Sequence, residues 1–264
     1  MIVVLLIVLG LCFGSFVNAL VWRLHEHRNF VNERSECTHC HHVLAPKDLV
    51  PVVSWLLLRG KCRYCRKPIQ DTPVAELLVP ALWVVSYVYW PHALYSSLGL
   101  FTFVAWLLFV VGFVALAIYD FKWFLLPDKI VFPLIGLAAA QVLASWLVFR
   151  QPWHDVLPGA GLGVLVLSGF FYVLYVLSRG TWIGFGDVKL GVVLGLLAGG
   201  MLRALLVLFV ASFVGMLIAV PLLLAGKMSR KSHLPFGPLL LVGMFVVELW
   251  GTHILDAYIR LVAP

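Results

Sequence analysis

Two aspartates stand where long apolar segments meet short polar ones, in a chain that has only 12 acidic residues. Asp120 follows the apolar run Leu98–Tyr119, and Asp187 closes the sequence Gly184-Phe185-Gly186-Asp187. An ionisable side chain at the edge of a lipid-embedded helix is costly, so a functional role is its default interpretation. Two carboxylates held close together do not both ionise easily, and one that keeps its proton acts as an acid beside a basic partner. This is the chemistry of an aspartyl protease, and Asp120 and Asp187 are the candidate catalytic residues.

The residues around these aspartates favour a backbone that a peptide can approach. Gly184 and Gly186 have no side chain to keep a substrate away from the nearby carboxylate. Pro235 and Gly237 begin the last apolar segment, where two prolines leave the backbone short of hydrogen-bond donors. A groove for an extended peptide and an ordinary loop-to-helix junction both fit this segment. We predict a substrate-positioning role for Gly184, Gly186, Pro235 and Gly237.

Other acids have simpler interpretations. Asp128 just precedes an apolar segment, where an aspartate is a common helix N-cap. Glu248 lies in the last apolar segment, and either Arg203 or Arg260 is a candidate ion-pair partner. The structural alternatives for the two candidate catalytic residues are a lysine ion pair and a helix cap, respectively.

Four cysteines form two CxxC pairs separated by 21 residues, Cys37-Thr38-His39-Cys40 and Cys62-Arg63-Tyr64-Cys65. Two such pairs place four thiolates around one zinc ion, with S–Zn distances of ~2.3 Å. Disulfides are the alternative, but a reducing cytoplasm disfavours them, and a domain of about 50 residues needs a staple to fold. Four thiolates close the coordination shell. We therefore predict a structural zinc site made of Cys37, Cys40, Cys62 and Cys65.

The composition indicates a membrane protein. Only 12% of the residues are charged and the mean hydropathy is +1.02, whereas about 25% charged residues are usual in soluble domains. About 20 apolar residues cross the ~30 Å of hydrocarbon in a bilayer. Eight apolar segments are expected to span the membrane: Ile2–Leu20, Val74–Trp90, Leu98–Tyr119, Ile130–Phe149, Val156–Leu177, Val188–Ala198, Leu202–Leu224 and Phe236–His253. Because Val188–Ala198 covers only ~17 Å at ~1.5 Å per residue, one of its ends is expected below the membrane surface.

The sequence therefore predicts an all-α polytopic membrane protein with about eight transmembrane helices. Residues 1–22 form the first helix, residues 23–73 a small zinc-stapled cytoplasmic domain, and residues 74–264 a seven-helix domain that carries the aspartates. The small and polar residues Gly14 to Asn18 suit close packing of the first helix, with a site contact as the alternative for Asn18.

Basic residues set the expected orientation, because cytoplasmic loops are enriched in Lys and Arg. If residues 23–72 are cytoplasmic, sixteen basic residues lie inside and three outside. Both termini are then outside, and both aspartates lie on the cytoplasmic side. Basic loops also explain the net charge of +7 without a nucleic-acid partner, and the lipid bilayer is the expected surrounding.

Helix ends suggest separate roles for the two aspartates. A helix carries about −0.5 charge at its C-terminus and +0.5 at its N-terminus. Asp120 is expected at a helix C-terminus and Asp187 at a helix N-terminus. On this argument Asp187 is the base that activates water and Asp120 is the acid.

The ordered set of motifs resembles the type IV prepilin peptidase family, the bifunctional leader peptidase/N-methyltransferases of bacterial inner membranes. The resemblance covers most of the chain, and GxGD alone would be a weak signal. The motifs are Gly14-Ser15-Phe16-Val17-Asn18, Arg34-Ser35-Glu36-Cys37-Thr38-His39-Cys40, Pro51-Val52-Val53-Ser54-Trp55-Leu56, Leu58-Arg59-Gly60-Lys61-Cys62-Arg63-Tyr64-Cys65, Asp120 with Leu126-Pro127-Asp128, Gly184-Phe185-Gly186-Asp187 and Pro235-Phe236-Gly237-Pro238.

The resemblance implies an activity, substrates and a methyl donor. The family cuts the short leader of type IV prepilins and pseudopilins at the cytoplasmic face, usually between Gly and Phe, with the aspartates that align with Asp120 and Asp187. It then methylates the new N-terminal amine from S-adenosylmethionine, using the cytoplasmic domain. The chain departs from the family pattern at Thr38 and in the run Ile69–Glu76. Two alternatives stay open: a peptidase without methylation, and a proton-coupled transporter or channel that uses the two acids as a relay.

Overall fold

The computed structural model describes residues 1–29, 34–69, 72–227 and 235–262. Gln70 and Asp71 of the run Ile69–Glu76, and Arg230 and Lys231, which were counted among the sixteen basic residues, lie outside the described residues. The described chain is almost entirely helical, and its β-structure is limited to two isolated bridges. The helices are α1 (Ile2–His25), the 3₁₀ helix η1 (Pro46–Asp48), α2 (Val53–Leu57), α3 (Val74–Val88), α4 (Ser97–Trp123), α5 (Asp128–Leu147), α6 (Trp153–Ser178), α7 (Phe185–Ala198), α8 (Met201–Leu224) and α9 (Phe236–Val262).

The predicted all-helical, multi-pass architecture is confirmed. In the described part of the chain, six helices are long and apolar enough to cross a membrane, namely α1, α4, α5, α6, α8 and α9. The other two expected spans, α3 and α7, have 15 and 14 residues, so a total of eight spans stays a prediction. Several helices exceed their expected bounds: α1 continues to His25, α4 continues past Asp120 to Trp123, and α9 continues to Val262. Helices α6 and α7 each begin three residues earlier than expected.

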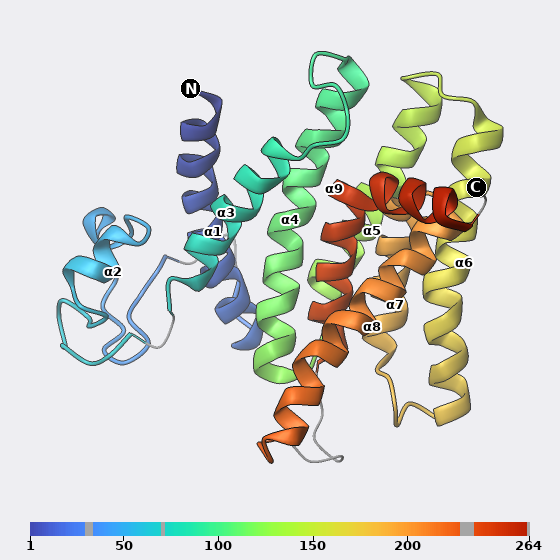
Figure 1. Ribbon diagram of the computed structural model, residues 1–264. Helices are drawn as coiled ribbons and strands as arrows, with labels where there is room; N and C mark the ends of the chain where they lie inside the picture. The colour runs from blue at the N-terminus through green and yellow to red at the C-terminus, as the bar shows by residue number, and fades with distance from the viewer. Residues whose placement is uncertain (30–33, 70–71, 228–234, 263–264) are drawn as a thin grey trace. The chain divides into compact units, whose positions relative to one another are not determined.

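Residue contacts divide the chain into two compact units. The first contains Met1–Val88 and Leu107–Ile118, and the second contains Tyr89–Trp106 and Tyr119–Pro264. Helix α4 therefore contributes residues to both units (Figure 1). The predicted division of the chain at residues 22 and 73 is not tested by these units and stays a prediction.

In the first unit, glycines let α1 pack closely on α3. A Cβ atom on Gly10 would lie 2.6 Å from the Cα of Pro80, and one on Gly14 would lie 2.5 Å from the Cα of Glu76. Real Cβ contacts are never this short, so both positions require glycine. The packing role predicted for the Gly14 segment is confirmed, and this contact fixes the backbone of Glu76.

In the second unit, the short helix α7 is buried among α5, α6, α8 and α9 (Figure 1). Leu190, Val193 and Leu194 have no exposed surface. The contact with α6 is made through backbone, because a Cβ on Gly163 would lie 2.2 Å from the carbonyl oxygen of Gly195. The partners of α7 therefore fix its position, and its first turn carries Asp187.

One ion pair in this unit was anticipated from the sequence. The Arg203 guanidinium donates to the Glu248 carboxylate over 2.7 Å, and it joins α8 to α9. The predicted pairing of Glu248 with Arg203 is confirmed. Both side chains are mostly buried, so the pair satisfies two charges that would be costly alone in this environment.

Candidate active site and metal centre

The two CxxC pairs fold into the same kind of turn, Cys37–His42 and Cys62–Lys67. In each turn the N–H of the first cysteine donates to the carbonyl of the last residue, and its carbonyl accepts from the residue before, over 2.9–3.0 Å. That penultimate residue, His41 or Arg66, has a positive φ of 54° or 58°. Each turn thus curls the backbone around its first cysteine and presents two sulfurs on one side.

The four cysteine sulfurs lie within 4.8 Å of one another. Thiolates bound tetrahedrally at ~2.3 Å from zinc would be about 3.8 Å apart, and Cys37 Sγ lies 3.8 Å from Cys65 Sγ. Burial raises the pKa of the Cys37 thiol, but the backbone N–H groups of Cys40 and His39 lower it to about 7. The quartet Cys37, Cys40, Cys62 and Cys65 therefore fits the predicted structural zinc in number and spacing.

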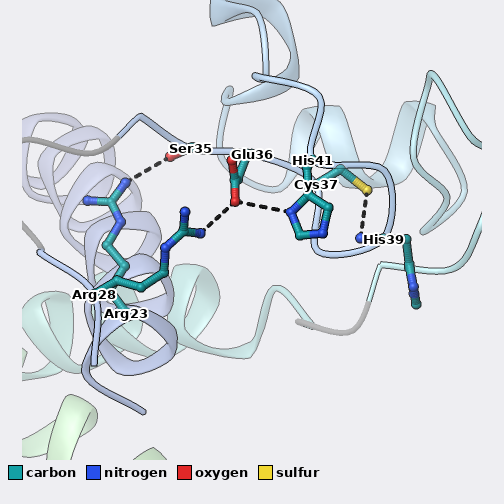
Figure 2. Close-up of polar contacts among 7 residues, drawn as sticks. All are labelled: Arg23, Arg28, Ser35, Glu36, Cys37, His39 and His41. Carbon is teal, nitrogen blue, oxygen red and sulfur yellow. Dashed lines mark hydrogen bonds and ion pairs between the residues drawn. The ribbon is translucent and has the colours of Figure 1, made fainter. Parts of the chain in front are cut away.

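Ion pairs tie the first turn to the end of α1 (Figure 2). The Arg28 guanidinium lies 2.5 Å from the Glu36 carboxylate, and His41 Nδ1 lies 3.3 Å from the same oxygen. The hydrogen bond from Arg28 holds the pKa of Glu36 below its usual range. A weaker contact of 3.5 Å joins the Arg23 guanidinium to the Ser35 hydroxyl. His41 therefore points to Glu36 and lies outside the metal cluster.

Asp48 gives the second turn a similar anchor. Its carboxylate accepts hydrogen bonds from Arg63 Nε at 2.6 Å and from the Tyr64 hydroxyl at 3.1 Å. Its side chain is only 2% exposed. Burial raises its pKa, but these bonds outweigh that effect, and the pKa of Asp48 lies below its usual value. The zinc-binding turns are thus held by carboxylates on both sides.

The two candidate catalytic aspartates line one cavity of about 700 Å³ in the second unit. Asp120 lies in the last turn of α4 and is 6% exposed, whereas Asp187 lies in the first turn of α7. Helix α4 ends just beyond Asp120, where Phe124 adopts the left-handed conformation and its N–H bonds the carbonyl of Asp120. The cavity is also lined by three of the predicted substrate-positioning residues, Gly184, Gly186 and Pro235.

The backbone at the starts of α7 and α9 contacts these carboxylates directly. The N–H of Gly237 bonds the Asp120 carboxylate, and a Cβ on Gly237 would lie 2.6 Å from Asp120 Oδ2. The N–H of Gly184 bonds the Asp187 carboxylate. A Cβ on Gly186 would lie 3.0 Å from Leu126. The glycines therefore keep the backbone close to the acids.

One interpretation from the sequence needs correction. Asp128 is the first helical residue of α5 and does not cap it, because Pro127 occupies the N-cap. The Asp128 carboxylate instead forms an ion pair with Lys189, which lines the cavity. The assignment of separate acid and base roles stays a prediction: Asp120 lies in the last turn of α4 and Asp187 in the first turn of α7, as the helix-end argument expects, but the N–H of Gly237 in the first turn of α9 also bonds the Asp120 carboxylate.

The chain matches the model of the type IV leader peptidase family over residues 106–220, and that of the bacterial peptidase A24 N-terminal domain over residues 8–90. It is 30% identical to the prepilin leader peptidase/N-methyltransferase of Stutzerimonas stutzeri, with 96% of this chain and 92% of the relative covered. The chain belongs to the type IV leader peptidase family. Relatives with the same description in Bacillus subtilis and Aeromonas hydrophila are 30% and 32% identical, over 97% of this chain and 98% and 93% of theirs. No solved structure shows a significant match.

The two matched ranges contain different sites. The peptidase range contains both aspartates and Gly184-Phe185-Gly186-Asp187, whereas the N-terminal range contains the cysteine cluster and Glu76. Pro235 and Gly237 lie beyond both ranges, although the structure places them beside Asp120.

Proposed function

We propose that this chain is a membrane aspartyl endopeptidase that removes the short leader of type IV prepilins or pseudopilins and methylates the new N-terminal amine. The peptidase activity is supported by one observation: Asp120 and Asp187, from two different helices, line the same cavity. The names of the relatives support both halves, because each is described as a prepilin leader peptidase/N-methyltransferase.

Hydrolysis follows from a pair of carboxylates that share a proton. The ionised carboxylate takes a proton from a water molecule, which attacks the scissile carbonyl, and the protonated carboxyl donates to the substrate. The Asp120 and Asp187 titrations are coupled, so the roles belong to the pair. Gly184, Gly186, Pro235 and Gly237 let an extended peptide reach both acids.

The proposed membrane arrangement follows the distribution of charge. The zinc-binding domain and the two aspartates are on the cytoplasmic side of a bacterial inner membrane, and both termini are outside, because sixteen of the basic residues then face the cytoplasm. The test is a reporter enzyme that is active only in the cytoplasm, fused after residue 264. Activity of this fusion would contradict the arrangement, because the C-terminus is proposed to lie outside.

The division of labour is also part of the proposal. Residues 74–264 carry the peptidase, and residues 23–73, stapled by zinc at the four cysteines, belong to the methyltransferase part. Bound S-adenosylmethionine supplies an electrophilic methyl group on a sulfonium. Nothing in the described residues favours the transporter alternative, since the two acids share one cavity.

Two asparagine variants test the peptidase. Asp120→Asn and Asp187→Asn keep the size of each side chain but remove an ionisable group, so each is expected to abolish cleavage of a pilin-like precursor while the protein still inserts into membranes. Asp155→Asn, at an exposed aspartate at the start of α6, is the matched control and should cleave normally. Near-normal cleavage by either active-site variant would refute the aspartyl mechanism.

A further inference from the structure

The short connection between α4 and α5, Phe124–Pro127, lies against the backbone beside both candidate catalytic acids. A Cβ on Gly186 would lie 3.0 Å from Leu126 Cβ, and one on Gly237 would lie 3.5 Å from Leu126 Cδ2. Gly186 directly precedes the acid of α7, and the N–H of Gly237 bonds the Asp120 carboxylate. Leu126 therefore contacts the starts of both α7 and α9, at the two glycines that adjoin the acids.

An ion pair ties the end of this connection to α7. The Lys189 ammonium of α7 bonds the carboxylate of Asp128, the first residue of α5. It also lies 5.6 Å from the ring centroids of Phe132 and Phe185, a distance at which aromatic faces attract cations. Only 19% of the Lys189 side chain is exposed. One carboxylate and two rings therefore hold the ammonium in place.

This ion pair closes a short path between the two acids. Asp120 and Asp128 stand on either side of the connection, and Lys189 follows Asp187 by two residues. Lys189 carries the only positive charge among the described residues that line the peptidase cavity. Isolated ion pairs at a surface contribute little to stability, so the importance of this pair is expected to lie in the geometry that it imposes.

We propose that Leu126, Asp128 and Lys189 are positioning residues, which hold the two catalytic carboxylates at the separation that peptide hydrolysis requires. The inference rests on the peptidase half of the proposed function. Without the ion pair, the connection between α4 and α5 can move relative to α7, and the contact of Leu126 with Gly186 loosens. A shift of about 1 Å in a catalytic group costs on the order of 10²-fold in rate, so even a small displacement lowers kcat.

A double-mutant cycle tests the pair. Asp128→Asn and Lys189→Met are each expected to lower kcat for cleavage of a pilin-like precursor by about 10-fold, with KM nearly unchanged. Either change alone already breaks the pair. The double variant is therefore expected to lose about 10-fold as well, and not the roughly 100-fold product of two independent effects. Lys189→Arg keeps the charge and should retain most of the rate.

The matched control is Lys129→Met, because Lys129 is exposed beside Asp128 and does not line the cavity. It should cleave at the wild-type rate. Losses that multiply in the double variant, or a normal rate for Asp128→Asn, would overturn the proposal. A raised KM with unchanged kcat in Lys189→Met would also overturn it, because Lys189 would then act on the substrate directly.

A second measurement reads the geometry without activity. Hydrogen exchange of the purified full chain in detergent, followed by mass spectrometry, should be faster in Lys189→Met over residues 121–128 and 182–189, because these backbone segments lose a mutual contact. Residues 34–69 and the Lys129→Met variant should exchange as the wild type does. Unchanged exchange in Lys189→Met would overturn the proposal, and so would faster exchange throughout residues 72–227, which would show general loosening.

Failure of the proposed function has a different signature. A wild-type chain that does not cleave the precursor would refute the peptidase, whatever the variants do. The hydrogen-exchange comparison would then still decide whether the ion pair holds the connection between α4 and α5 against α7.

Discussion

At the scale of single residues, Asp120 is held by a backbone that admits no side chain at Gly237. A Cβ there would lie 2.6 Å from Asp120 Oδ2, so Gly237→Ala must displace either the carboxylate or the start of α9. A shift of about 1 Å in a catalytic group costs on the order of 10²-fold in rate. We expect Gly237→Ala to lose about that much cleavage activity, measured as the initial rate on a pilin-like precursor.

The control for this variant is Gly136→Ala in α5. A Cβ on Gly136 meets nothing within 4 Å, and alanine is favoured over glycine in helices by about 1 kcal/mol. Gly136→Ala should therefore cleave normally. Equal activity of the two alanine variants would mean that Gly237 does not position Asp120.

The sequence predicted which residues belong to the candidate sites better than it predicted the contacts that nearby residues make. Asp120 and Asp187 stand out because acids are rare in apolar surroundings, and the cysteines stand out through local spacing. The ion pair between Asp128 and Lys189 and the bond from Val52 to Glu76 join residues 61 and 24 positions apart. Such contacts depend on tertiary packing, which apolar patterns and spacing do not encode.

At the scale of helices, the position of Asp187 depends on how α7 packs against α6. Gly163→Ala would place a Cβ 2.2 Å from the carbonyl oxygen of Gly195. Overpacking of this kind usually costs about 1–3 kcal/mol. We expect this variant to unfold at a lower temperature in detergent and to lose cleavage activity, because α7 must move to admit the methyl group.

Gly161→Ala is the matched control in the same helix, since a Cβ at Gly161 meets nothing within 4 Å. It should keep or slightly raise the unfolding temperature. An unfolding temperature for Gly163→Ala as high as that of Gly161→Ala would contradict the backbone contact between α6 and α7.

Helices were easier to predict than their ends. All eight apolar segments form helices, because long apolar runs bounded by Pro and Gly leave few alternatives. The extra turn of α4 beyond Asp120 ends at Phe124 in the left-handed conformation, which a non-glycine residue rarely adopts. The sequence carries no sign of that cap. The length of α4 and the position of Asp120 inside its last turn therefore could not be predicted from the sequence.

At the scale of the whole molecule, the two proposed activities depend to different degrees on zinc. The cysteine cluster belongs to the first unit, whereas the aspartates and their cavity belong to the second. The segment that carries the cysteines, residues 34–69, contains little regular structure beyond η1 and α2. A small domain of this kind lacks a core large enough to fold without a staple.

Loss of zinc should therefore abolish methylation and spare part of the peptidase. Structural zinc contributes roughly 10–16 kcal/mol to the folding of small zinc domains, which is comparable with the stability of about 5–15 kcal/mol of whole proteins. Cys62→Ser is expected to lose the metal, to expose residues 34–69 to proteases and to stop methylation of a pre-cleaved peptide. Cys12→Ser is the matched control, because Cys12 is exposed on α1 and outside the cluster. Elemental analysis should find one zinc per chain in the wild type and in Cys12→Ser. Unchelated wild-type protein without zinc would refute the metal site, and full methylation by Cys62→Ser would show that the turns fold without it.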